Sequence, residues 1–289
     1  MTEPDNTRRQ HQAPSRPPAP HHEPPVSLVL LDLDGTLLRD NKTVSDYTLQ
    51  VLNRCQQEGI LIGFCTSRGK TSIGHLITQV KPDIVATNGG ATITLRDTVL
   101  HHQGFTVQET QTLLDAAYRI IGPDCEITVD TADQLYWNRG DHKSVMFHPQ
   151  ALEHDFRNFP HPAMKVCVQT DDKALAAAIA HTVPHCHALL FSDVPWHSFA
   201  PGSATKEAAA QLLSQHLSIP HPEIMAFGDD CNDLGMISTV GRGIAMGNAI
   251  PEIKAVAKDV AATNNEDGVA QYLEKLLQSQ RSQRFSLSQ

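Results

Sequence analysis

Long apolar runs, paired cysteines and excess positive charge are all missing from this sequence of 289 residues. Its longest apolar segments are far shorter than the roughly 18 residues that a membrane-spanning helix needs. The six cysteines form no CxxC pair, so a disulfide scaffold or a structural zinc site is disfavoured, and we expect reduced thiols in the cytoplasm. The net charge of −9 argues against binding to nucleic acid or to an anionic membrane.

Composition and periodicity divide the chain into a folded body between two polar tails. Residues 1–25 hold 7 of the 18 prolines and almost no apolar side chains, so we expect a disordered tail there, and a polar C-terminal tail over 279–289. Strands and helices alternate over 26–95 and again over 196–278, which predicts an α/β core with a Rossmann-like parallel sheet. The different pattern over 96–195 predicts an inserted α+β cap domain.

Local signals predict several individual elements of this core. Residues 26–31, apart from Ser27, and residues 60–65 form apolar runs, as strands covered on both faces require. Ser45 is suited to begin the helix between these two strands, and Gly59 to end it. A second helix is predicted over 206–217, ahead of another apolar strand.

Acidic residues follow two of the apolar strands. Asp32 and Asp34 come after the first strand, where alternate positions face the same way and Gly35 permits a turn. On their own they could equally be turn-forming residues. The strand over 224–227 is followed by a second acidic cluster, G-D-D-C-N-D at 228–233. Since the carboxyl ends of parallel strands meet at one ligand-binding edge, the two clusters together predict a site for a hard cation such as Mg²⁺.

These motifs resemble those of haloacid-dehalogenase-superfamily phosphatases in residue type, order and spacing. Part of the pattern is similar to the Cof-type subgroup, which carries a large cap between the second and third motifs. The resemblance covers about residues 27–277. It rests on D-L-D-G-T-L-L at 32–38, T-S-R at 66–68, N-G-G at 88–90, Lys206, G-D-D-C-N-D at 228–233, G-I-A-M-G-N at 243–248 and N-E-D-G-V at 265–269.

The resemblance implies a set of roles in phosphoryl transfer. Asp32 would be the nucleophile, and Asp34 the general acid and base, for which we expect a raised pKa. Thr66 would bind the transferring phosphoryl group and Lys206 would neutralise charge. The implied Mg²⁺ site consists of Asp32, the backbone carbonyl of Asp34, Asp229 and Asp233. The implied phosphate- or substrate-binding residues are Ser67, Arg68, Asn88, Gly89 and Asn232. Ser67 stands where the family usually has glycine.

These roles predict a Mg²⁺-dependent phosphatase of small phosphorylated metabolites, such as sugar phosphates, pyridoxal phosphate or FMN, working as a monomer or homodimer. Two alternatives stay open. A phosphomutase of the phosphomannomutase-like type would return the phosphoryl group to a sugar instead of releasing free phosphate. A non-catalytic phosphometabolite-binding module would retain the fold without turnover.

Overall fold

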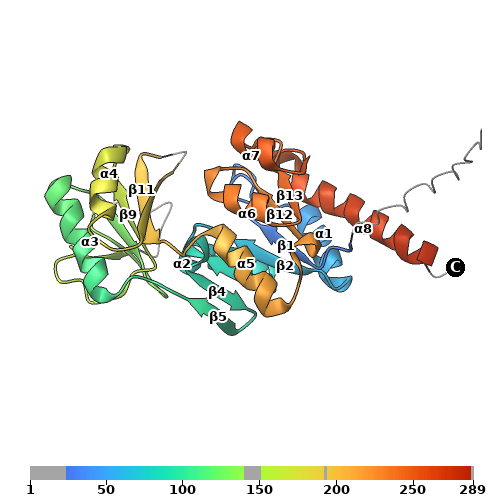
Figure 1. Cartoon of the computed structure of the whole chain (residues 1–289), viewed down its shortest axis with the longest axis horizontal. Coiled ribbons are helices and arrows are strands. Elements are labelled where there is room, and N and C mark those ends of the chain that lie inside the picture. The colour runs from blue at the N-terminus through green and yellow to red at the C-terminus, as the bar shows by residue number, and fades with distance from the viewer. Residues whose placement is uncertain (1–23, 140–150, 192–193, 288–289) are drawn as a thin grey trace, which may run out of the picture.

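The computed structural model describes residues 24–139, 151–191 and 194–287 of the chain. Two bodies, each with its own sheet, lie next to each other along the long axis of the molecule (Figure 1). The two ends of the chain build the larger body, so the smaller one is an insertion into it. None of the described helices is long and apolar enough to cross a membrane. The tail expected over residues 1–25 falls almost wholly outside the described residues.

The larger body contains an eight-stranded sheet. Six neighbouring strands are parallel, and two more form an antiparallel hairpin at one edge. The alternating strands and helices of the sequence predicted this parallel α/β arrangement. In spatial order the strands are β14 (Asp259–Val260), β13 (Arg242–Ala245), β12 (Ile224–Gly228), β1 (Leu28–Leu31), β2 (Leu61–Cys65), β3 (Ile84–Thr87), β4 (Thr92–Leu95) and β5 (Thr98–His102).

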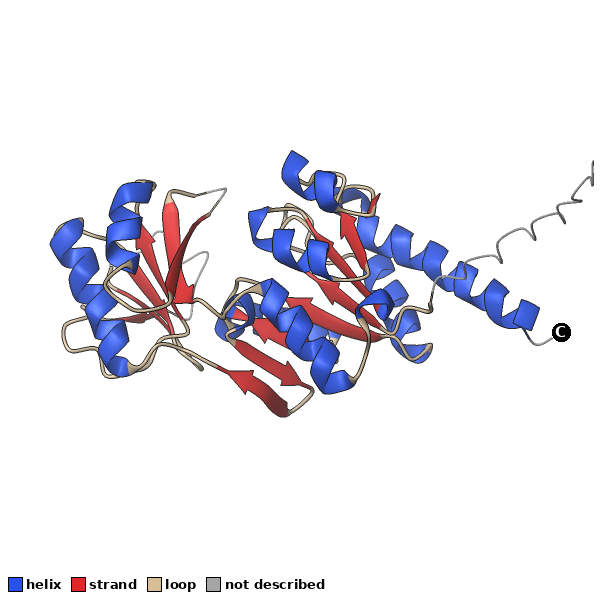
Figure 2. Cartoon of the chain, in the orientation of Figure 1, coloured by secondary structure: helices blue, strands red, loops and turns tan. Residues whose placement is uncertain are grey.

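Helices cover both faces of this sheet (Figure 2). Along β1, Val29 and Leu31 pack into the apolar cluster on one face, and Leu28 and Leu30 into the cluster on the other. All four are fully buried, which is why this strand reads as a continuous apolar run. The first cluster includes residues of α1 (Asp46–Gln57), α2 (Lys70–Val80), α7 (Pro251–Val256) and α8 (Gly268–Leu287), and the second those of α5 (Lys206–Leu217) and α6 (Leu234–Thr239).

The capping signals of the core helices are confirmed. Ser45 precedes α1, and its hydroxyl accepts a hydrogen bond from the backbone N–H of Thr48. Gly59 follows the end of α1 with a φ of +86°, a conformation that favours glycine. Helix α5 spans the expected residues 206–217, with Thr205 as its N-cap. The start of α5 matters for function because its first residue is the lysine singled out by the sequence.

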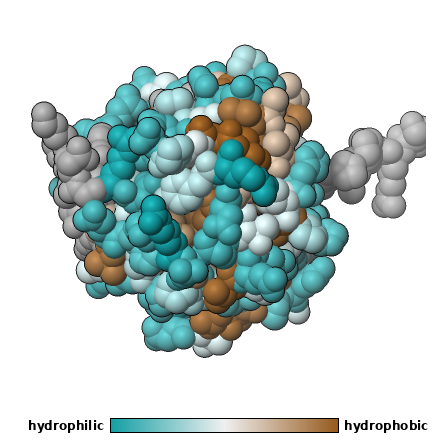
Figure 3. All heavy atoms as spheres, turned by 90° about the vertical axis from the view of Figure 1, so that its left-hand side faces the viewer, coloured by the Kyte–Doolittle hydropathy of each residue, from teal (hydrophilic) through white to brown (hydrophobic). Residues whose placement is uncertain are grey.

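The smaller body is a six-stranded sheet whose apolar face packs against two helices. Helix α3 begins with a capping box, in which Thr106 and Glu109 each bind the backbone N–H of the other. On the outer face of this body, hydrophilic side chains surround smaller hydrophobic patches (Figure 3). Its elements are the strands β10 (Cys186–Leu190), β11 (Trp196–Pro201), β9 (Lys165–Gln169), β6 (Ile127–Asp130), β7 (Leu135–Trp137) and β8 (Leu152–Glu153), in spatial order, with helices α3 (Val107–Ile120) and α4 (Lys173–Ala180).

Three segments differ from the expected organisation. Strand β5 was expected in the cap, but it pairs with β4 in the larger sheet. Strand β11 was expected in the core, but it pairs with β9 and β10 in the smaller sheet. In both cases the hydrogen bonds to partner strands decide to which of the two sheets the strand belongs. The C-terminal residues 279–289 were expected as a tail, but α8 runs through most of them, and Arg281 Nη2 lies 2.6 Å from Glu58 Oε1 of the core.

Candidate active site

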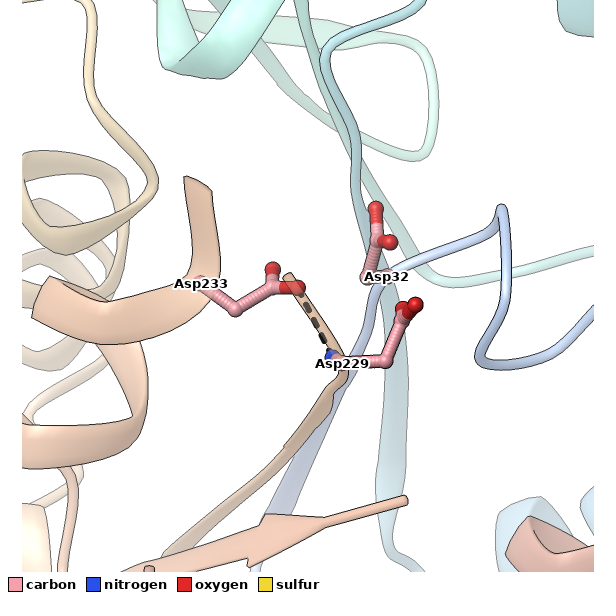
Figure 4. Close-up of side chains that lie close together, drawn as sticks. All are labelled: Asp32, Asp229 and Asp233. Carbon is pink, nitrogen blue, oxygen red and sulfur yellow. Dashed lines mark hydrogen bonds between the residues drawn. The ribbon is translucent and has the colours of Figure 1, made fainter. Parts of the chain in front are cut away.

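Three carboxylates meet at the carboxyl edge of the larger sheet (Figure 4). Asp32 directly follows β1, and Asp229 directly follows the adjacent parallel strand β12. Asp233 ends a short 3₁₀ helix, η4 (Cys231–Asp233), that begins just after Asp229. One oxygen from each of the three side chains lies within 4.8 Å of the others. The two acidic clusters of the sequence therefore meet as expected, with the exception of the Asp34 side chain.

Asp233 is fixed in place by hydrogen bonds at both of its oxygens. Its Oδ2 accepts from the backbone N–H groups of Asp229 at 3.0 Å and Asp230 at 3.2 Å. Its Oδ1 accepts from Lys206 Nζ at 2.7 Å. The side chain of Asp233 is wholly buried. Asp233 therefore acts as an anchor that connects the turn after β12 to α5.

Lys206 links two of the three carboxylates. It is the first residue of α5, and its Nζ lies 2.5 Å from Asp32 Oδ1 and 2.7 Å from Asp233 Oδ1. Its side chain is only 3% exposed. Burial alone would lower the pKa of Lys206, but the carboxylates of Asp233 and Asp32 outweigh burial and hold this pKa above its ordinary value. The ammonium group stays protonated and neutralises part of the negative charge of the site.

The site is nevertheless short of positive charge. Burial raises the pKa of Asp32 well above its ordinary value, against the attraction of Lys206. Burial, with Asp233 nearby, raises the pKa of Asp229 to about 7, despite a 2.7 Å hydrogen bond from the hydroxyl of Thr36. Three carboxylates that share one ammonium group are relieved by a divalent cation, and an all-oxygen donor set is what Mg²⁺ prefers. The residues present therefore fit Mg²⁺.

Gly35 makes the close packing of this site possible. It has a φ of +70°, and a Cβ atom at this position would lie only 2.1 Å from Asp229 Oδ2. Its carbonyl oxygen accepts a 2.7 Å hydrogen bond from the side chain of Asn248, within the segment G-I-A-M-G-N. Asn248 Oδ1 in turn accepts from the backbone N–H of Asn264. The segment 243–248 and the neighbouring Asn264, both near the C-terminal end of the chain, thus support the turn that follows β1.

Asp34 lies apart from the three-carboxylate cluster. Arg68 donates to both of its oxygens, each at 2.6 Å, and Lys42 Nζ donates to Oδ1 at 2.7 Å. Burial raises the pKa of Asp34, but the hydrogen bonds and charges of Arg68 and Lys42 outweigh burial, so the net shift of this pKa is downward. The raised pKa expected from the sequence is therefore wrong for this conformation, because two cations stabilise the carboxylate.

The loop after β2 holds Thr66 and Arg68 near these acids. The buried hydroxyl of Thr66 accepts a hydrogen bond from the backbone N–H of Arg68 at 3.1 Å. The neighbouring turn secures the loop by backbone contacts, since Asn88 N–H donates to Arg68 O and Gly89 N–H to Thr66 O, both at 2.9 Å. Asn88 and Gly89 therefore act on the loop through their backbone. Ser67 also contributes its carbonyl oxygen, which accepts from Lys165 Nζ.

Asn232 and Lys42 lie at the edges of the site. Asn232 lies inside η4, half-buried, next to the anchored Asp233. Lys42 had been given no role by the sequence, although it binds Asp34. It lies in a turn where Lys42 N–H donates to Arg39 O, and nothing in the spacing of the motifs pointed to it.

Comparison with known proteins defines the class of the chain. A family model described as haloacid dehalogenase-like hydrolase matches residues 29–273. The chain is 29% identical over 265 residues to the 5-amino-6-(5-phospho-D-ribitylamino)uracil phosphatase of Bacillus subtilis, covering 86% of this chain and 96% of that protein. It is also 29% identical over 244 residues to the HMP-PP phosphatase of Klebsiella pneumoniae, covering 80% and 87%.

A solved structure shares the fold. The haloacid dehalogenase-like hydrolase from Bacteroides thetaiotaomicron superposes with a TM-score of 0.76 at 22% identity, covering 87% of this chain and 99% of that one. The two-body fold, the matched family model and the phosphatase relatives make this chain an enzyme of the phosphatase class. The chain belongs to the haloacid dehalogenase-like hydrolase family.

Proposed function

We propose that this enzyme hydrolyses phosphate monoesters of small metabolites with Mg²⁺, through an aspartyl-phosphate on Asp32. The observation that carries the proposal is the position of Asp32, buried against Lys206 and beside two further carboxylates at the carboxyl edge of the sheet. A carboxylate is a poor nucleophile toward a phosphate dianion because both are negative. Lys206 lowers this repulsion and orients Asp32 for attack.

In the first step an oxygen of Asp32 would bond to phosphorus while the bond from phosphorus to the leaving oxygen breaks. Thr66 would hydrogen-bond the transferring group, and Asp34 would protonate the leaving oxygen. In the second step the oxygen of a water molecule would bond to phosphorus while the bond from phosphorus to the Asp32 oxygen breaks. The water would give a proton to Asp34, and the step would release inorganic phosphate and the free Asp32 carboxylate. Because Arg68 keeps Asp34 ionised in this conformation, Asp34 is ready to accept a proton, and it has to leave Arg68 before it can donate one.

The chain offers a suitable set of oxygen ligands for Mg²⁺. Asp32, the backbone carbonyl of Asp34 and Asp229 would hold the ion, with Asp233 supporting them through its hydrogen bonds to the turn. When bound, Mg²⁺ would supply positive charge to the phosphate oxygens. The remaining predicted residues, which are Ser67, Arg68, Asn88, Gly89 and Asn232, would shape the phosphate side of the site.

The substrate class rests on the relatives. Two of them are named for 5-amino-6-(5-phospho-D-ribitylamino)uracil and for HMP-PP, which supports a small phosphorylated metabolite as the substrate here. Sugar phosphates, pyridoxal phosphate and FMN belong to the same size class. All six cysteines are free thiols, which supports our proposal of a cytoplasmic enzyme.

Phosphate release tests this proposal. Purified protein is incubated with a panel of phosphorylated metabolites and Mg²⁺, and free phosphate is measured with and without a chelator. We expect release from a subset of the panel, loss of activity with the chelator, and a decrease of at least about a thousandfold in Asp32→Asn. Asp97→Asn, which changes an exposed acid in the β4–β5 turn, serves as the control.

The same assay distinguishes the alternatives. A phosphomutase would convert a hexose phosphate into its isomer without releasing phosphate. A binding module would bind one of the compounds and leave it unchanged. Equal rates with and without the chelator would refute the metal-dependent mechanism.

A further inference from the structure

A buried ion pair lies at the end of the smaller sheet. Lys165 begins β9 and Asp130 ends β6, and the two residues are direct partners in this antiparallel pair of strands. Lys165 Nζ lies 3.1 Å from Asp130 Oδ2, and the two side chains are only 10% and 7% exposed. Neither residue belongs to the acidic site described above. They come from the cap, whereas the site comes from the core.

The pair contacts the core at one loop. Lys165 Nζ donates a 2.8 Å hydrogen bond to the carbonyl oxygen of Ser67. Gly69 packs so closely against the pair that a Cβ atom on it would lie 2.2 Å from Asp130 Oδ1. Ser67 and Gly69 are the two neighbours of Arg68 in the chain, so the cap holds the loop on both sides of this residue.

The core also holds this loop, through hydrogen bonds to its backbone carbonyls. Asn88 N–H donates to the carbonyl of Arg68, and Gly89 N–H donates to the carbonyl of Thr66. The loop is thus bound both by the turn at 88–90 and by the ion pair of the cap. Its side chains Thr66 and Arg68 face the phosphate side of the site in our proposed function.

The electrostatics of the pair favour a positioning role over a purely stabilising one. Burial alone would lower the pKa of Lys165, but Asp130 outweighs burial and holds this pKa above its ordinary value, so the ammonium remains a strong donor. A buried ion pair can often be replaced by apolar side chains without loss of stability. Apolar side chains cannot donate a hydrogen bond to the Ser67 carbonyl.

We propose that Lys165 and Asp130 are positioning residues, which fix the loop 66–69 from the cap and thereby place Thr66 and Arg68 for phosphoryl transfer. This inference rests on the proposed function for the roles of Thr66 and Arg68. The cap then contributes to the chemistry of the core through the backbone of one loop. The contact also ties the position of the cap to the geometry of the site.

The test uses the full chain and separates stability from positioning. Lys165→Met leaves Asp130 buried without its partner, so we expect a lower unfolding temperature together with lower activity. The double variant Asp130→Asn/Lys165→Met removes both charges, and we expect its unfolding temperature to return close to the wild-type value. Its kcat should stay at least about tenfold below wild type, because the loop is still unsupported. Lys165→Arg, which keeps charge and donors, should recover most of the lost kcat.

Hydrogen exchange provides a readout that does not depend on turnover. We expect amides of residues 66–69 to exchange faster in the double variant than in the wild type. The control is Arg281→Met/Glu58→Gln, which removes the ion pair between α8 and the core and should leave exchange of the loop unchanged. A double variant with wild-type kcat and wild-type loop exchange overturns the inference. If the wild type releases phosphate from no compound, the proposed function fails, and loop exchange still decides the positioning role.

Discussion

Arg68 binds Asp34 through two hydrogen bonds, from Nε to Oδ2 and from Nη2 to Oδ1, each 2.6 Å long. Lys42 adds a third at 2.7 Å. These contacts join the first motif of the chain to the second, and they stabilise the charged form of Asp34. Proton donation by this carboxyl group therefore requires a change in its contacts with Arg68. In the proposed mechanism Arg68 thus controls whether Asp34 can carry a proton.

Replacing Arg68 by Met should raise the pKa of Asp34. Because the pKa of Asp34 is lowered in the folded wild type, the stabilisation from this pair is present above the ordinary pKa of about 4 and is lost as the pH falls through the lower folded value. Chemical denaturation of the wild type and of Arg68→Met from pH 3 to pH 7 measures the difference in their free energies of unfolding. We expect this difference to be no more than about 1 kcal/mol above pH 5, since the Asp34 side chain is 40% exposed, and to decrease as the pH falls toward 3.

Arg119→Met is the control for this experiment, because Arg119 is an exposed residue of the cap helix α3. It should show the same pH dependence of unfolding as the wild type. A stability difference between Arg68→Met and the wild type that stays constant over the whole pH range would mean that Arg68 does not act through the ionisation of Asp34.

Much of the core could be predicted from the sequence because its signals are local. The Ser45 cap and the bounds of α5 depend on neighbouring residues alone. The expected domain boundaries were wrong for β5 and β11 because each cut a hairpin: β5 pairs with its chain neighbour β4, and β11 with its chain neighbour β10, so each strand stays in its neighbour's sheet. The helical C-terminus was missed for a different reason, since it contacts a residue far away in the chain: Arg281 reaches Glu58, more than two hundred residues earlier.

The same distinction applies to the site. The meeting of Asp32 with Asp229 followed from the rule that parallel strands end at one edge, so the parallel α/β pattern of the sequence was sufficient to predict it. The side-chain contacts that set the charge of each acid could not be predicted from the sequence. Nothing in the spacing indicated that Arg68 and Lys42 reach Asp34, or that a cap lysine reaches the carbonyl of Ser67.

Gly35→Ala should weaken Mg²⁺ binding by moving Asp229. The variant carries a cost of about 1–2 kcal/mol for a positive φ, and its Cβ would displace the Asp229 carboxylate, which lies 2.1 Å away. Gly59→Ala is a matched control, since Gly59 has a φ of +86° with nothing within 4 Å of its added Cβ. Both variants should lose stability in denaturation, but only Gly35→Ala should lose Mg²⁺ affinity in calorimetry. Equal affinities would show that the turn adjusts without moving Asp229.

Lys206→Met should destabilise the enzyme strongly at neutral pH. It leaves Asp32 and Asp233 buried without their cation, for which we expect about 3–5 kcal/mol in the free energy of unfolding without metal. The loss should shrink toward pH 5, because burial raises the pKa values of Asp32 and Asp229, and their protonation relieves the repulsion within the site. Lys254→Met, which removes a hydrogen bond from an exposed lysine to Gly247, should cost far less. A loss of the same size at pH 5 and pH 8 would contradict the charge-based explanation.

The affinity for Mg²⁺ should increase as the pH rises from 5.5 through about 7. Burial, together with Asp233, raises the pKa of Asp229 to about 7, so below this pH a proton would occupy the carboxyl group that we propose as a ligand of the ion. Each pH unit below 7 should therefore lower the affinity by up to about tenfold for this one proton. Calorimetric titrations with Mg²⁺ between pH 5.5 and pH 8.5 measure the effect directly.

Asp229→Asn tests whether the pH dependence of the Mg²⁺ affinity comes from Asp229 and not from the other acids of the site. The variant should bind Mg²⁺ more weakly at every pH, and its affinity should depend less on pH than that of the wild type. Asp97→Asn, in the exposed β4–β5 turn, should match the wild type at every pH. If the wild-type affinity were equal at pH 5.5 and pH 8.5, Asp229 would not be a ligand that competes with a proton. The ligands of the ion would then all be ionised at pH 5.5, which contradicts a bound Asp229 whose pKa is raised to about 7.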